Sequence, residues 1–167
     1  LDQGILCEQE LVFGVGRPSV SLAVRADEAW FIGISMQDDP VVLVLTDLHG
    51  TVHVRLQLPR LTTTDDCVAA LADTVHILRQ TVGATKDKLS GIGIALPGFV
   101  SRDRRTCVAC TALGWRNINI GSAMAELTGL PTWVENDAKA LILGEELFGP
   151  LRGSPDFSMV FVSHGIG

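Results

Sequence analysis

A carboxylate and an amide stand side by side in "VENDAKA", where Glu135, Asn136 and Asp137 separate an apolar run from a segment of helical character. In one interpretation, Asn136 or Asp137 caps the helix by accepting a backbone N–H of its first turn. In the other, Asp137 points into a cleft as a base or a hydroxyl acceptor, and Asn136 is a second polar contact. A carboxylate only accepts hydrogen bonds whereas an amide also donates them, so the pair suits a polyhydroxylated ligand. Spacing alone leaves both interpretations open.

Two further short segments with polar or turn-forming residues follow apolar runs. They are Ser35–Asp39 in "GISMQDDP" and Pro97-Gly98 in "GIALPGFV". In open α/β sheets, ligands bind beyond the carboxyl ends of the strands. We therefore expect these two segments and Glu135–Asp137 to lie together at one edge of a sheet and to form the site.

Four cysteines offer another candidate chemistry. Cys107 and Cys110 form a single C-x-x-C, and Cys7 and Cys67 lie elsewhere. A structural zinc site needs four ligands and no second ligand pair lies nearby, so we predict two core thiols beside a hairpin and no metal site. Without other features of a disulfide scaffold, the cysteines predict a reduced, cytoplasmic setting.

The strands that would position the site follow from the hydrophobic pattern. Strand-like runs over 29–35, 41–47 and 51–58, separated by short turns, predict a meander with His49-Gly50 in its second turn. Residues 1–28 differ in pattern and predict two short β-segments around a Gly-Val-Gly-Arg-Pro turn.

The pattern then changes to a helical period, with Thr64 or Asp65 as the cap and Gly83 at the end. Further helices are expected over about 120–128 and 138–148. Further strands are expected in "GIGIALPG", at 132–135 and in "FSMVFVSHGIG", with a small hairpin in "FVSRDRRTCVAC" whose tip, Arg102 to Arg105, is a solvated turn. This order predicts an α/β fold with a mixed sheet flanked by helices.

The composition limits the class of protein. The 167 residues have the length of one ordinary domain, and 47% of them are apolar, enough to bury a substantial core. A net charge of −6 argues against an autonomous nucleic-acid-binding surface. No apolar stretch has the length of a transmembrane helix and no signal peptide opens the chain, so we expect no membrane partner. The chain begins with Leu1 and ends in "GIG", so we expect both ends to be internal to a longer protein.

Four motifs carry a family resemblance. "GIGIALPGFV", "LGWRNINI", "LTGLPTWVENDAKALILGE" and "MVFVSHGIG" occur in the order and at the distances found in the ROK family of sugar-responsive repressors and sugar kinases, which the chain resembles from about residue 30 to its end. The resemblance implies the actin-like ATPase (ribonuclease-H-like) fold, with two lobes around a sugar cleft. It implies that 29–150 is the first lobe and 151–167 the start of the second.

The first residues resemble the repressor branch of this family. "GRPSVSLAV" is similar to the end of a winged-helix domain, in which a Gly-Arg-Pro turn precedes the last wing strand. The resemblance implies that residues 1–28 are a remnant of the wing and linker, and that the recognition helix lies before Leu1. An ordinary surface hairpin is the alternative.

A phosphate loop distinguishes the kinases of this family from the regulators. Its Asp-x-Gly-Gly-Thr glycines offer backbone N–H groups to the nucleotide. The matching positions here are Ser35, Gln37, Asp38 and Asp39, followed by Pro40, which has no N–H. Two carboxylates repel a triphosphate in a partly dry cleft, so we expect a regulator more than an enzyme. Magnesium binding by Asp38 and Asp39, or a plain solvated turn, are alternatives for this segment.

Three other positions bear on the same question. His164 stands where the kinases have a glycine-rich turn, and some repressors of the family place a His in this region, although a strand-end residue is the alternative. Ala112 replaces an Asn that family members often have, which leaves the identity of the sugar open. Trp115 offers an apolar face to a ligand or, as we favour, packs in the core.

The resemblance implies a cytoplasmic, sugar-responsive transcriptional regulator. Gly98, Asn136 and Asp137 would bind a sugar or sugar phosphate together with residues beyond Gly167, and operator DNA would be bound by a domain outside this chain. A homodimer or higher homo-oligomer is expected, without a cofactor; the family's zinc-binding cysteine cluster would lie downstream. In the kinase alternative, Asp137 deprotonates a hydroxyl of a hexose or N-acetylhexosamine, and ATP and Mg²⁺ are required.

Overall fold

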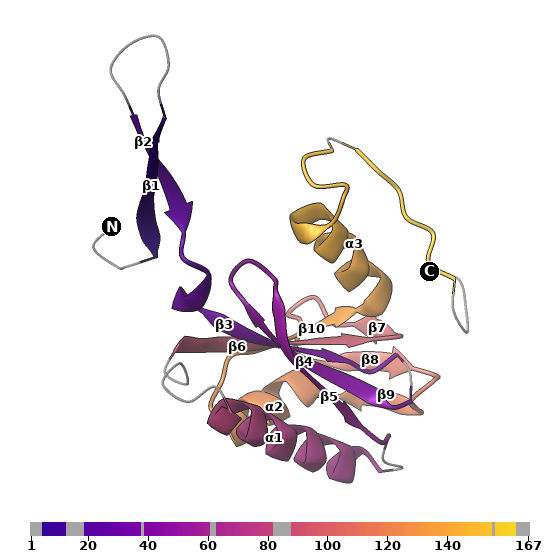
Figure 1. The fold of residues 1–167 in the computed structure, drawn as a ribbon. Helices are drawn as coiled ribbons and strands as arrows, with labels where there is room; N and C mark the ends of the chain where they lie inside the picture. Colours follow the sequence, from indigo (N-terminus) through magenta and orange to yellow (C-terminus); the bar gives the residue numbers. More distant parts are fainter. Residues whose placement is uncertain are drawn as a thin grey trace.

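The computed structural model in Figure 1 describes residues 5–12, 19–37, 39–60, 63–81, 88–154 and 156–162. Four sequence-based expectations lie outside these residues: the Gly-Val-Gly-Arg-Pro turn, Asp38, Gly83 and His164.

A five-stranded mixed sheet of order β10-β6-β3-β4-β5 forms the centre of the fold. Strands β3 (Trp30–Ser35), β4 (Val41–Asp47) and β5 (Val52–Leu58) make the predicted antiparallel meander. Strand β6 (Leu89–Leu96) runs parallel to β3, and β10 (Thr132–Asn136) runs parallel to β6. Side chains of β3 and β4 alternate between buried and half-buried positions, so one face of these two strands is buried.

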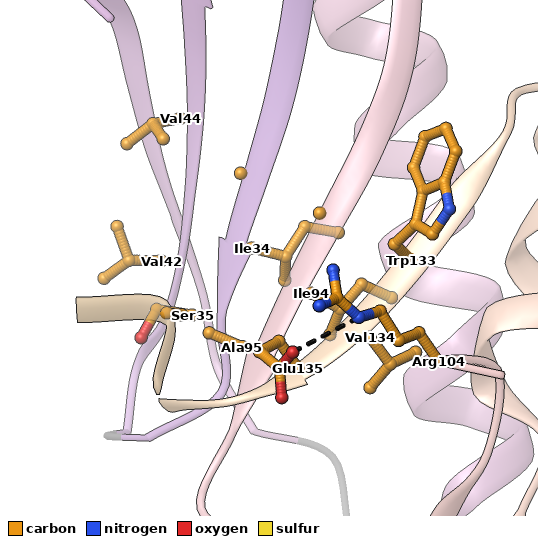
Figure 2. Close-up of a pocket in the computed structure, with 13 residues that line it drawn as sticks. Ile34, Ser35, Val42, Val44, Ile94, Ala95, Arg104, Trp133, Val134 and Glu135 are labelled. Carbon is orange, nitrogen blue, oxygen red and sulfur yellow. Dashed lines mark ion pairs between the residues drawn. The ribbon is translucent and has the colours of Figure 1, made fainter. Parts of the chain in front are cut away.

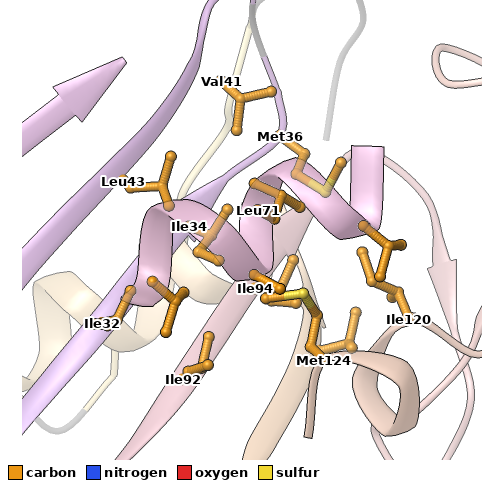
Figure 3. Packing of buried hydrophobic residues seen from close by; sticks show 14 of the residues in the cluster. Ile32, Ile34, Met36, Val41, Leu43, Leu71, Ile92, Ile94, Ile120 and Met124 are labelled. Atoms are coloured by element: carbon orange, nitrogen blue, oxygen red, sulfur yellow. The ribbon is translucent and has the colours of Figure 1, made fainter. Parts of the chain in front are cut away.

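Helices α1 (Thr64–Thr81) and α2 (Ile120–Thr128) cover that face (Figure 1). Leu71 of α1 and Met124 of α2 are fully buried, and Figure 3 shows them beside Ile34 and Ile94 of the sheet. Burying side chains of this size contributes about 1.5–3 kcal/mol each, which makes this layer the main source of stability.

The cap of α1 differs by one residue from the predicted Thr64 or Asp65. Thr63 Oγ1 accepts a hydrogen bond from the backbone N–H of Asp66 at 3.2 Å and donates one to its carboxylate at 2.6 Å. The residue before the helix supplies the cap because only an Ncap in extended conformation can direct its side chain at the N3 amide. Because "LTTTDD" contains consecutive threonines, the sequence does not distinguish which of them caps the helix.

Helix α3 (Asp137–Phe148) lies on the other side of the sheet from α1 and α2 and contacts β10 and β6 (Figure 1). It begins one residue before the predicted start. A second, three-stranded sheet contains β7 (Phe99–Val100), β8 (Cys107–Cys110) and β9 (Trp115–Ile118). The predicted hairpin is confirmed as β7–β8, and β9 was not expected. Trp115 is 7% exposed, which confirms packing in the core.

Strands β1 (Leu6–Val12) and β2 (Ser19–Val24) form a separate antiparallel hairpin that projects from the rest of the chain (Figure 1). The 3-10 helix η1 (Ala26–Glu28) connects this hairpin to β3. The hairpin strands agree with the two β-segments predicted in residues 1–28.

The strand predicted in "FSMVFVSHGIG" is not formed within the described residues 156–162, which contain only one bridge residue, Val162. An isolated strand leaves its backbone groups unpaired and needs a neighbouring strand, and Val160 is 74% exposed here. No described helix is long and apolar enough to cross a membrane.

Candidate functional site

The carboxyl ends of three parallel strands meet at one edge of the sheet, as predicted. Ser35 of β3 and Glu135 of β10 both lie in register with Ala95 of β6, and Asn136 lies in register with Leu96. The described residues of the Ser35–Asp39 segment, Pro97-Gly98 and Glu135–Asp137 therefore leave the sheet side by side.

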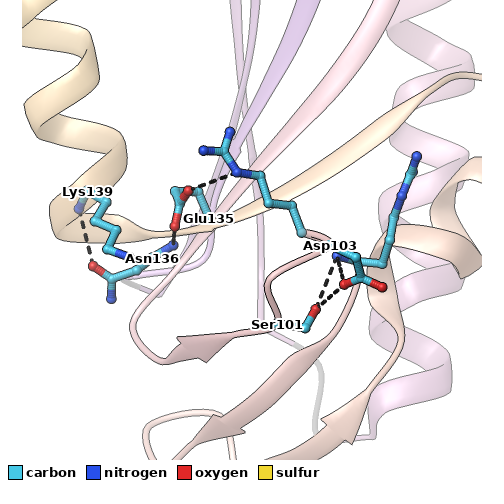
Figure 4. Close-up of polar contacts among 7 residues, drawn as sticks. Ser101, Asp103, Glu135, Asn136 and Lys139 are labelled. Atoms are coloured by element: carbon cyan, nitrogen blue, oxygen red, sulfur yellow. Dashed lines mark hydrogen bonds and ion pairs between the residues drawn. The ribbon is translucent and has the colours of Figure 1, made fainter.

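Asn136 is the N-cap of α3, so the structural interpretation of this residue is correct. Its backbone is extended, with φ −64° and ψ 139°, and its Oδ1 accepts from the backbone N–H of Lys139 at 3.2 Å (Figure 4). Its Nδ2 donates to the carbonyl oxygen of Gly98 and to Oδ1 of Asp137, each at 3.2 Å. Both amide protons thus have partners within the protein, which makes Asn136 a residue that positions the site.

Asp137, the first residue of α3, has a carboxylate with one engaged and one available oxygen. Its Oδ1 accepts from the backbone N–H of Ala138 at 2.9 Å and from Asn136. Among the described residues no hydrogen bond reaches Oδ2, although Asp137 is only 8% exposed. Asp137 can therefore accept a hydrogen bond or a proton from a ligand hydroxyl.

Gly98 lies too close to the β8 strand to carry a side chain. A Cβ atom there would lie 2.5 Å from the carbonyl oxygen of Ala109 and 2.8 Å from Cβ of Cys110. The Gly98 N–H donates to Leu96 at 2.9 Å, which forms the tight turn after β6. Gly98 thus allows the hairpin to approach the sheet edge and presents its carbonyl to Asn136.

Arg104 and Glu135 form an ion pair that the sequence did not predict. Arg104 Nε lies 3.4 Å from Glu135 Oε2 (Figure 2). Glu135 Oε1 accepts from the backbone N–H of Asn136 at 2.9 Å (Figure 4). The Arg104 carbonyl also accepts from the N–H of Val134 at 3.0 Å. The expectation that Arg102 to Arg105 is only a solvated turn is therefore wrong at Arg104, which joins the hairpin tip to β10. It is also wrong at Arg105, whose guanidinium donates to the Thr132 carbonyl oxygen of the same strand.

Hydrogen bonds from Arg60 stabilise the turn after β3. The Met36 N–H donates to Ala95 O at 2.9 Å, and the Arg60 guanidinium donates to the carbonyl oxygens of Met36 and Gln37 at 3.0 and 3.2 Å. The backbone N–H of Arg60 donates to Asp39 Oδ1 at 3.1 Å. In its described part, this turn presents carbonyl oxygens and a carboxylate to Arg60.

A pocket of about 350 Å³ lies on the α3 side of the sheet, next to this edge (Figure 2). Its floor consists of small or apolar residues, which alternate along the strands with residues buried in the core. Arg104 and Glu135 also line the pocket. These floor residues include Gly33, Val42, Val44, Gly93 and Ala95. The small residues Gly93 and Ala95 in "GIGIA" are the feature of the sequence that could have indicated this pocket.

Cys107 and Cys110 are the predicted core thiols beside a hairpin. Both are buried in β8, and Cys110 Sγ donates to the Pro97 carbonyl oxygen at 3.1 Å. Burial raises the pKa of Cys107 to about 11 and also raises the pKa of Cys110. Both groups are therefore neutral thiols near neutral pH.

Comparisons with known proteins agree with this architecture. The family model described as "ROK family" matches residues 31–167. The xylose repressor of Bacillus subtilis (strain 168) is 28% identical over 97% of this chain and 44% of the repressor. A crystal structure of a ROK family transcriptional regulator, a homolog of the E. coli MLC protein, has a TM-score of 0.72 and 27% identity, covering 88% of this chain and 38% of that one.

A crystal structure of a ROK family glucokinase from Streptomyces griseus, in complex with glucose and AMPPNP, has a TM-score of 0.71 and 25% identity, covering 83% of this chain and 43% of that one. These likenesses confirm the predicted actin-like α/β fold. The chain spans less than half the length of each of these three proteins.

Proposed function

The chain belongs to the ROK family, and on that basis we propose that it is part of a cytoplasmic, sugar-responsive transcriptional regulator. In this proposal residues 29–150 are the first lobe of the sugar-binding domain and 151–167 begin the second. Residues 1–28 are the end of a winged-helix wing with its linker. Operator DNA is bound by a domain outside this chain, and the assembled protein is a homodimer or higher homo-oligomer.

The turn after β3 is the observation that favours a regulator over a kinase. A phosphate loop binds nucleotide through free backbone N–H groups. Here the Met36 N–H is bonded to Ala95, and the carbonyl oxygens of Met36 and Gln37 are held by Arg60. Gln37 stands at the position of a loop glycine, and Asp39 adds a negative charge at the position of the loop threonine. These features favour a turn that does not bind a triphosphate.

The effector is a sugar or sugar phosphate that enters at the edge of the sheet. Asp137 Oδ2 accepts from a sugar hydroxyl, and Asn136 holds Asp137 and the Gly98 turn in place. This refines the role expected for Asn136, which acts on the ligand through its neighbours. Residues of the second lobe complete the site.

The test uses the full-length protein with D-xylose, D-glucose and N-acetyl-D-glucosamine as probes. We expect calorimetry to detect binding of at least one sugar, and a coupled assay with ATP and Mg²⁺ to detect no phosphate transfer. Turnover that Asp137→Asn abolishes would refute the regulator-only proposal and establish the kinase alternative. Absence of binding by every probe would count against sugar sensing.

The second candidate function, a sugar kinase, is favoured by one observation. Asp137 presents a carboxylate oxygen that no described residue hydrogen-bonds, in a fold shared with a glucokinase. In that case Asp137 removes the proton of the attacking hydroxyl, and ATP with Mg²⁺ is required as the phosphate donor.

A further inference from the structure

The β1–β2 hairpin is attached to the sheet through the turn between β4 and β5. The His49 ring donates from Nε2 to the carbonyl oxygen of Val24, the last residue of β2, at 2.9 Å. The backbone N–H of Leu48 donates to the carbonyl oxygen of Ala26, the first residue of η1, at 3.0 Å. Two adjacent residues of this turn therefore hold the point at which the hairpin leaves the lobe.

Asp47 makes this turn a stiff unit. Its carboxylate is 7% exposed, and Oδ1 accepts from the backbone N–H groups of His49 and Thr51 at 2.9 and 3.0 Å. Its Oδ2 pairs with His53 Nε2 at 2.7 Å. Because one carboxylate bonds both sides of the turn, a displacement of Gly50 moves His49 as well.

The C-terminal end of α3 lies against the same turn. A Cβ atom on Gly50 would lie only 2.7 Å from the ring of Phe148, so this ring rests directly on the turn backbone. Phe148 is the last residue of α3 and Asp137 is the first. A single helix, about 18 Å long at 1.5 Å per residue, thus spans the distance from the candidate ligand carboxylate to the attachment of the hairpin.

We propose that α3 is a lever that couples ligand binding at Asp137 to the orientation of the β1–β2 hairpin, through Phe148, the β4–β5 turn and His49. This inference rests on the proposed function and adds the route by which the signal leaves the site. If α3 has two orientations, a ligand that binds the protein more tightly in one of them increases the population of that orientation. Phe148 is 58% exposed and His49 makes one hydrogen bond to the hairpin, so the contacts along the route are weak enough to rearrange.

The coupling can be measured first without ligand, by hydrogen–deuterium exchange of the Leu48 amide in the full-length protein. In Phe148→Ala we expect exchange to accelerate by roughly tenfold, because the turn loses its support. Leu127→Ala is the control, because this 51% exposed side chain belongs to α2, on the other side of the sheet from α3. We expect it to leave the exchange rate unchanged. His49→Ala gives the same acceleration, with His76→Ala on α1 as its control.

The second measurement adds D-xylose or D-glucose, with binding followed by calorimetry. We expect the bound sugar to change Leu48 exchange in the wild type, and Phe148→Ala to keep the affinity while losing the change. An undiminished response in Phe148→Ala, or sugar binding without any response in the wild type, would overturn the lever. Failure of both sugars to bind would count against the proposed function, whereas equal ligand-free rates in wild type and Phe148→Ala would by themselves overturn the coupling.

Discussion

Asn136 donates a hydrogen bond from Nδ2 to the carbonyl oxygen of Gly98, 3.2 Å away, and so joins the start of α3 to the turn after β6. The same side chain caps the helix through Lys139 and supports Asp137. The two interpretations of "VENDAKA" are therefore not exclusive. Asn136 supplies the cap, and the capped geometry leaves one oxygen of Asp137 for a ligand.

Asn136→Ala removes both the cap and the bond to Gly98. We expect a loss of about 2 kcal/mol in the free energy of unfolding, about half from each interaction. Asn136→Ser keeps a capping oxygen but no amide donor, so it should lose about 1 kcal/mol. Urea denaturation measures both values, and equal losses in the two variants would show that the cap contributes nothing.

Gly98, in the turn after β6, and Gly93, within β6 on the pocket floor, should respond differently to a methyl group. In Gly98→Ala the new Cβ meets the Ala109 carbonyl at 2.5 Å, so β8 must shift, and we expect a loss of about 1–3 kcal/mol. In Gly93→Ala the Cβ has no atom within 4 Å, and the change should be within about 0.5 kcal/mol. Urea denaturation of the two variants compares them directly. A large loss in Gly93→Ala would contradict the open pocket floor.

The main elements of the sheet could be predicted from the sequence because each has a local signal. In β4, apolar residues run without interruption from Val41 to Leu45, and "TDLHGT" has turn chemistry. The placement of the three candidate-site segments followed from the same information, since the carboxyl ends of parallel strands share one edge. Strand β9 was missed because "WRNI" contains only two apolar residues and forms through its pairing with β8.

The contacts that organise the site could not be predicted because they join residues far apart in the chain. Asn136 reaches back to Gly98, and Glu135 reaches Arg104 on the tip of a hairpin in another sheet. Such pairs depend on how the two sheets pack, which no local pattern encodes. The link from Phe148 to Gly50 has the same origin.

Asp137→Ala should weaken sugar binding by at least about tenfold, because the ligand hydroxyl loses its charged acceptor. Glu146→Ala, which removes an exposed carboxylate from the same helix, is the matched control and should leave the affinity unchanged. Calorimetry on the full-length protein with D-xylose or D-glucose measures both variants. Equal affinity of Asp137→Ala and the wild type would show that the ligand contacts lie elsewhere.

Cys107 should be unreactive toward thiol reagents in the folded protein. With a pKa of about 11, about one thousandth of its thiol is ionised at pH 8, and the side chain is fully buried. Cys7, which is half-buried on the hairpin, should be modified first. Mass spectrometry of limited alkylation, before and after unfolding in urea, distinguishes the sites. Rapid labelling of Cys107 in the native protein would contradict its place in the core.

Asp47 should make the junction between the β1–β2 hairpin and the central sheet sensitive to acid. Burial of its carboxyl favours the neutral form, but hydrogen bonds from His53, Thr51 and His49 outweigh this and hold the pKa of Asp47 below its usual value. Because the folded pKa is lowered, the contribution to stability is complete well above a pH of about 4 and is lost as the pH falls through the folded value.

Asp47→Asn should therefore be less stable than the wild type at pH 7, and the difference should shrink as the pH falls below about 4. Asp73→Asn on the exposed side of α1 is the control and should show no such convergence. Urea denaturation between about pH 3 and 7 measures the difference at each pH. A constant difference across this range would show that the ionised carboxylate is not what holds the β4–β5 turn.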